Sequence, residues 1–143
     1  MAYCSVTEVA SEFKDITFDA DSSITETEIE DFIDQESAFI DAKIAEKYET
    51  PVTGTSALLV LKKICIAVVA YRAKLILAVK TGEDSVDQET RANYQMVSKM
   101  ISDIAAGKTV LSDATRATAH DGFASYNSDQ LIEPVFDVTS QQW

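Results

Sequence analysis

Apolar side chains recur at helical spacing along most of the first hundred residues, and one stretch is apolar on nearly all sides. Residues 58–79 contain only four charged side chains and neither Pro nor Gly. Ser56 can cap the start of this stretch and Gly82 follows its end, which predicts a helix over 56–80. A helix this apolar is buried, either in lipid or among other helices. Its longest charge-free run is the eight residues 64–71, far short of the ~20 that a membrane-spanning helix needs. The pattern therefore favours a central helix in a bundle.

The remaining helices are predicted from local start and stop signals. Ser5 with Glu8, and Thr25 with Glu28, have the spacing of capping boxes and open two apolar stripes. A further stripe is capped near Ser85 and ends before Gly107, a residue typical of helix C-termini. The expected helices lie near 5–14, 25–48, 56–80 and 86–106. The predicted fold is all-α, an antiparallel bundle of about four helices around the long central one.

Two charged residues interrupt the apolar stripes. Glu36 lies near the middle of the stripe of the second helix, and Arg72 projects from the apolar side of the third. Charged groups in such positions are paired, lie at an interface, or extend to water. One hypothesis is that Glu36 and Arg72 meet, within one subunit or between subunits; the other is that Arg72 reaches solvent alone.

Helical periodicity is lost from Lys108 onward, although large apolar side chains continue. Residues 135–139 follow Pro134 and have the pattern of a short edge strand. A segment this long without regular structure is either a functional arm or disordered, and its aromatic residues favour the arm. We therefore expect a helical domain over 1–107 and an extended C-terminal arm over 108–143. The arm docks on a partner or folds back over its own helices. With Glu36 and Arg72, the candidate interface residues are Phe123, Tyr126, Leu131, Val135, Phe136, Val138 and Trp143.

The formal net charge of −12 is concentrated in the first third of the chain. Residues 1–50 hold 14 acidic side chains against three lysines, a balance of −11. Such a surface repels phosphate backbones and anionic membranes. It suits a basic protein partner, or a surface along which DNA must pass without being held.

One acidic stretch has the spacing of a calcium loop. Six oxygen-bearing residues occupy the ligand positions of an EF-hand, but Ile24 stands where that loop needs Gly. The favoured alternative is an acidic loop before a helix N-terminus, where carboxylates interact well with the helix dipole. The six residues are Asp19, Asp21, Ser23, Thr25, Thr27 and Glu30. No metal and no cofactor is predicted.

Little else points to chemistry. The chain has a single His, His120, and none of the sequence motifs of hydrolases, nucleotide-binding enzymes or zinc proteases. Cys4 and Cys65 are too few for a disulfide framework and are expected to be free thiols in a reducing compartment. The N-terminus has no secretory-signal pattern. We expect a protein that is not an enzyme.

Four segments in fixed order carry a resemblance to a known family. They are the opening residues 1–9, the end of the second helix at 42–52, the central 61–75, and 94–111. Together they resemble the small head–tail connector (adaptor, or head-completion) proteins of tailed bacteriophages, most closely the Mu-like branch. The resemblance covers about residues 1–111, and the tail departs from the basic ending of that branch.

The resemblance implies a structural virion protein rather than a catalyst. Such proteins form a homo-oligomeric ring, usually of about twelve subunits, beneath the portal protein. The ring extends the channel through which DNA passes non-specifically and joins the capsid to a downstream tail, stopper or completion protein. The resemblance thus implies a place in the virion neck, after assembly in the host cytoplasm, and an arm that reaches the portal or a neighbouring subunit. The alternative function is a small acidic helical binding module, inhibitor-like or antitoxin-like, that shields a basic protein partner.

Overall fold

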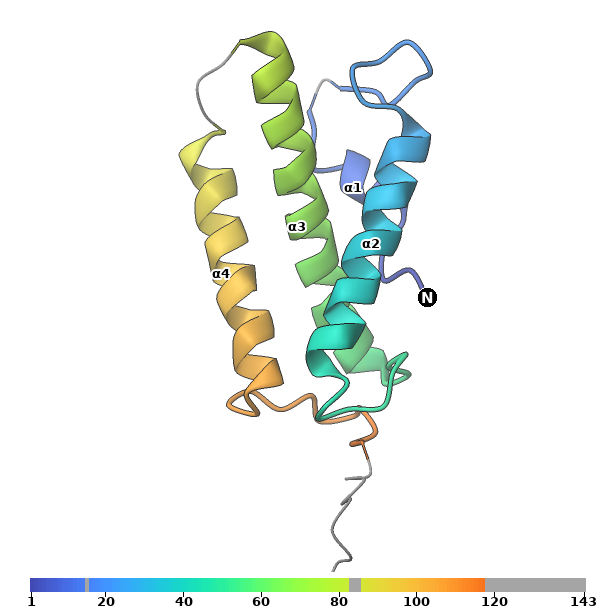
Figure 1. Ribbon diagram of the computed structural model, residues 1–143, viewed down its shortest axis with the longest axis vertical. Coiled ribbons are helices and arrows are strands. Elements are labelled where there is room, and N and C mark those ends of the chain that lie inside the picture. Colours follow the sequence, from blue (N-terminus) through green and yellow to red (C-terminus); the bar gives the residue numbers. More distant parts are fainter. Residues whose placement is uncertain (15, 83–85, 118–143) are drawn as a thin grey trace, which may run out of the picture.

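The computed structural model describes residues 1–14, 16–82 and 86–117, and within them the protein is all-α. Three long helices lie side by side, and consecutive ones run antiparallel (Figure 1). A short first helix packs behind them, against the second and third. The helices are α1 (Val6–Ala10), α2 (Glu26–Ile44), α3 (Thr55–Thr81) and α4 (Gln88–Ala105). The predicted fold class is confirmed.

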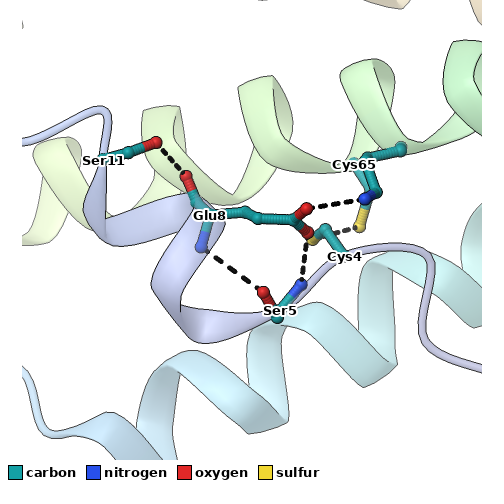
Figure 2. A network of polar contacts seen from close by, with 6 residues as sticks. Cys4, Ser5, Glu8, Ser11 and Cys65 are labelled. Carbon is teal, nitrogen blue, oxygen red and sulfur yellow. Dashed lines mark hydrogen bonds and ion pairs between the residues drawn. The ribbon is translucent and has the colours of Figure 1, made fainter.

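Helix α1 begins as predicted but is shorter than the expected 5–14. The Ser5 hydroxyl accepts a hydrogen bond from the Glu8 N–H at 3.4 Å, and the Glu8 carboxylate accepts one from the Ser5 N–H at 3.0 Å (Figure 2). After Ala10 the chain tightens into three-residue turns, with the Phe13 N–H donating to the Ala10 carbonyl at 3.0 Å. This turn brings Phe13 against Phe18, edge to face at 5.2 Å between ring centroids.

Helix α2 begins with the second capping box, between Thr25 and Glu28, which is also confirmed. It ends at Ile44, before the predicted 48. The Tyr48 N–H still donates to the Ile44 carbonyl at 2.9 Å, but Tyr48 itself leaves the helix to form an antiparallel bridge with Arg116.

Helix α3 ends as predicted, at Gly82 in the left-handed conformation with φ of 76°. The predicted cap at its start is wrong. Ser56 lies inside the helix, and Gly54 at the N-cap position has no side chain to offer. The cap comes from a distant residue instead: the Asp113 carboxylate accepts the backbone N–H groups of Ser56 at 2.6 Å and Ala57 at 2.9 Å.

Helix α4 is capped by Asp87, whose carboxylate accepts the Thr90 N–H at 2.8 Å. The predicted cap, Ser85, lies outside the described residues. Val86 precedes the helix rather than opening its apolar face, and is buried. Gly107 has a φ of 74° and follows the helix, as predicted.

Helix α3 is the centre of the bundle. It contacts α1, α2 and α4 and buries nine residues, more than any other described helix. The predicted position at the centre of the bundle is confirmed, although the three neighbouring helices leave part of the apolar surface of α3 exposed. Leu59, Leu75 and Val79 are 63%, 44% and 74% exposed. Within residues 1–14, 16–82 and 86–117, no helix is long and apolar enough to cross a membrane.

The chain after α4 continues along the bundle instead of leaving it at residue 108. Leu111 is buried in the core, and its N–H donates to the Tyr48 hydroxyl at 2.9 Å. The Glu49 N–H donates to the Thr115 carbonyl at 2.9 Å, and the Ala117 N–H to the Lys47 carbonyl at 3.0 Å. Residues 108–117 therefore close the end of the bundle between α2 and α3. The predicted strand at 135–139 lies outside the described residues.

Candidate functional site

Glu36 and Arg72 meet between α2 and α3, as one of the two hypotheses predicted. Arg72 Nη1 lies 3.4 Å from Glu36 Oε1 and 2.9 Å from Gln35 Oε1. The guanidinium also stands over the Phe32 ring, 4.1 Å from its centroid. The contact is formed within one subunit, and the Arg72 side chain keeps 38% of its surface exposed. Arg72 is thus both paired and accessible to a partner.

The pair lies in a groove of about 310 Å³ that three helices form together. Its rim includes Phe39, 51% exposed, and Tyr94, whose ring stacks on Tyr71 with 4.2 Å between centroids. The groove is lined by Gln35, Glu36, Phe39, Ile40, Ile64, Val68, Arg72, Tyr94, Ser98 and Ile101. An apolar groove with one charged pair is suited to holding an apolar side chain or a short extended segment.

The exposed side of α2 is acidic in its first half. Five carboxylates of its first half are exposed: Glu26, Glu28, Glu30, Asp31 and Asp34. The Glu28 carboxylate accepts a hydrogen bond from the backbone N–H of Thr25, which lowers the pKa of Glu28. Five of the 14 acidic side chains of residues 1–50 therefore lie on the exposed side of one helix.

Three of the four lysines of α3 have bonding partners elsewhere in the bundle. Lys62 Nζ contacts Glu8 Oε1 at 2.6 Å, and Lys74 Nζ donates to the Thr90 hydroxyl at 2.8 Å. Lys80 donates to the Ser23 carbonyl. The bonds from Lys62 and from the Ser5 N–H lower the pKa of Glu8.

The remaining predicted interface residues, Phe123 to Trp143, lie outside the described residues. In the acidic loop before α2, Asp19 and Asp21 are exposed, while Ile24 is buried. Across the described ranges no three His, Cys, Asp or Glu side chains come together as a metal site would require.

Sequence reasoning missed three contacts between distant parts of the chain. They are the Asp113 cap on α3, the buried Ser37 hydroxyl that accepts the Tyr3 N–H at 3.1 Å, and the approach of Cys4 to Cys65. Each joins residues far apart in the chain, so no local pattern could have shown it. The Asp113 carboxylate accepts hydrogen bonds from the Ser56 and Ala57 N–H groups, and these bonds lower the pKa of Asp113.

The fold and these surfaces define a small all-α protein with a three-helix groove and a carboxylate-rich face. The family described as "Bacteriophage Mu, Gp36" matches residues 3–126, and the chain belongs to this family. It is a bacteriophage protein, and the family suggests a structural or morphogenetic role. No curated protein matches the sequence.

Proposed function

We propose that this protein is a head–tail connector subunit that self-associates into a ring and binds the portal protein. The observation that carries the proposal is the family match over residues 3–126. A role in particle structure needs surfaces for other proteins rather than a reaction centre. The exposed apolar side chains of α3 and the groove around Arg72 supply such surfaces.

The distribution of the apolar residues on α3 suits a ring. Leu59 and Leu75 are both exposed, yet they lie about 160° apart around the helix axis at 3.6 residues per turn. A closed ring uses two different patches on each subunit, whereas a two-fold dimer uses one patch twice. Val79 adds to the Leu75 side, and Met96 of α4, 50% exposed, adds further apolar surface.

The acidic face of α2 suits a surface along which DNA passes. A carboxylate face repels the phosphate backbone and releases no counterions on contact, so DNA passes it without being held. We assign this face to the channel side of the ring, with the Arg72 groove and the apolar sides of α3 left for protein contacts.

The test is assembly, measured by sedimentation of the purified chain alone and mixed with the portal protein of the same phage. The proposal expects the chain to sediment with the portal as a ring, visible in negative-stain micrographs. Val79→Asp should fold normally and weaken this assembly at least tenfold. Gln95→Asp, an exposed change on α4 that alters the net charge by the same amount, serves as the charge-matched control.

The connector role would be overturned if the protein stayed monomeric or dimeric and did not bind the portal protein at any concentration tested. If that chain instead bound a basic protein through the acidic face of α2, the alternative of an acidic shielding module would replace it.

A further inference from the structure

Two cysteines far apart in the chain meet in the core. Cys4 donates an S–H···S hydrogen bond to Cys65; the two sulfurs are 3.4 Å apart, and the residues are 61 positions apart in the chain (Figure 2). Cys65 is fully buried on α3, and Cys4 is 8% exposed in the segment that leads into α1. Both are free thiols. The chain contains no other cysteine, so each thiol has a single possible partner within the molecule.

The segment that carries Cys4 is held on both sides of the sulfur pair. Before it, the Tyr3 N–H donates to the Ser37 hydroxyl of α2 at 3.1 Å, and the Tyr3 hydroxyl donates to Asp41. After it, Glu8 of α1 pairs with Lys62 of α3 at 2.6 Å. These contacts fix the N-terminal segment across α2 and α3, so the sulfurs are kept face to face.

We propose that Cys4 and Cys65 are a reversible disulfide site, oxidised by hydrogen peroxide or a similar two-electron oxidant, which locks the N-terminal segment onto α3. A disulfide needs its sulfurs at about 2.05 Å. The remaining approach of somewhat over 1 Å is within reach of side-chain rotation at Cys4, which lies on a loop rather than in a helix.

The two thiols differ in pKa because their surroundings differ, and this difference gives them different roles in the oxidation. The bond donated by Cys4 lowers the pKa of the Cys65 thiol, with the Ser37 hydroxyl 3.7 Å away as a further partner. The same contact, with burial, raises the pKa of the Cys4 thiol. The lower pKa favours Cys65 over Cys4 as the thiolate, the nucleophilic form of a cysteine.

The reaction balances with peroxide alone. The Cys65 thiolate attacks one peroxide oxygen, the O–O bond breaks, and a sulfenic acid forms as hydroxide leaves. The Cys4 sulfur then attacks the Cys65 sulfur, the S–O bond breaks, and water departs with the Cys4 proton. Two thiols have lost two electrons and one peroxide has become two waters. A dithiol or phosphine reductant reverses the change.

The bond would change the molecule in a defined way. Closing a loop of this length restricts the unfolded chain and should raise the melting temperature by roughly 10 °C for a domain of this size. The inference stands apart from the connector role. If both hold, the subunit folds with free thiols inside the cell and is locked when the particle meets an oxidising medium.

The test treats the folded, full-length protein with hydrogen peroxide and follows three quantities. We expect both thiols to disappear together, an intact mass lower by two hydrogens, and a peptide map that joins the Cys4 and Cys65 peptides. The melting temperature should rise and return to its first value after dithiothreitol. Cys4→Ser should show none of the rise and should gain oxygen at Cys65 instead.

Three results would overturn the proposal: thiols that persist, stepwise addition of oxygen to each sulfur in the wild type, or a disulfide between two copies of the chain. The wild-type peptide map keeps the proposal testable even if a cysteine variant folds poorly. Oxidation of the urea-unfolded chain is the control, because it removes the face-to-face arrangement and should slow the intramolecular bond.

Discussion

Gly54 allows the C-terminal segment to reach the start of α3. A Cβ atom at this position would lie 2.3 Å from the Asp113 carbonyl oxygen and 2.6 Å from its carbonyl carbon. Both atoms belong to the backbone and cannot turn aside as a flexible side chain would. Gly54→Ala should therefore lower the free energy of unfolding by about 1–3 kcal/mol, measured by urea denaturation. Thr53→Ala, at the exposed neighbour, should change it by under about 0.5 kcal/mol; equal effects would show that Gly54 is not in close contact.

Asp113 makes stability depend on pH at the acid end. Its bonds from Ser56 and Ala57 lower its pKa, so the folded protein favours the ionised carboxylate. A lowered pKa contributes stability above the unfolded value of about 4, and this contribution is lost as pH falls through that value toward the folded one. Asp113→Asn should be less stable than the wild type at pH 7 and should lose less stability between pH 5 and pH 3. Melting temperatures across that range check this, with Asp21→Asn, an exposed acid, expected to follow the wild type.

Whether the role of a residue could be predicted depends on how far along the chain its hydrogen-bond partner lies. Ser5 and Thr25 bond partners three residues away, so their spacing alone predicted two helix starts. Asp113 acts across 57 positions, and its role depends on how the chain returns to the bundle. The nearby Ser56 was the better local candidate for a cap, and the tertiary contact overrode it.

Between elements, the Glu36–Arg72 contact was predictable because each charge interrupts an apolar stripe and needs a partner. Its strength follows from its exposure: the Arg72 side chain is 38% exposed and that of Glu36 19%. A double-mutant cycle on Glu36→Gln and Arg72→Met should give a coupling free energy of about 0.5–1 kcal/mol, less than a fully desolvated pair. Strict additivity would mean that Arg72 is held by Gln35 and the Phe32 ring alone.

Helix α3 offers a matched pair of valines that separates its buried side from its exposed side. Val69 is fully buried, and Val79 is 74% exposed on the same helix. Val69→Asp places an unpaired charge in the core and should abolish cooperative unfolding. Val79→Asp should change the free energy of unfolding by under about 0.5 kcal/mol. Circular dichroism during thermal melting compares the two, and similar melting curves would contradict the central position of α3.

For the whole molecule, the sequence predicted the number and order of the helices but not where the bundle ends. Loss of periodicity at Lys108 suggested an arm from that point. However, Leu111 is buried in the core, and the Asp113 carboxylate caps α3. The Thr115 carbonyl accepts a hydrogen bond from Glu49, in the chain after α2. These contacts form between segments that are distant in sequence. The polar stretch after Lys108 has no helical periodicity from which they could be predicted.

Truncation at two positions tests how the C-terminal residues are used. Ending the chain after Gly107 removes the buried Leu111 and the Asp113 cap. It should lower the melting temperature by roughly 10 °C or more, since a core side chain and the N-terminal cap of α3 are lost together. Ending it after Ala117 keeps both, so the melting temperature should stay within a few degrees of the full chain. If residues 118–143 serve as the predicted arm, this second truncation should nevertheless lose association with the portal in the sedimentation assay. A large loss of thermal stability after the second truncation would instead show that these residues cover the bundle, and intact assembly would remove the arm from the proposed function.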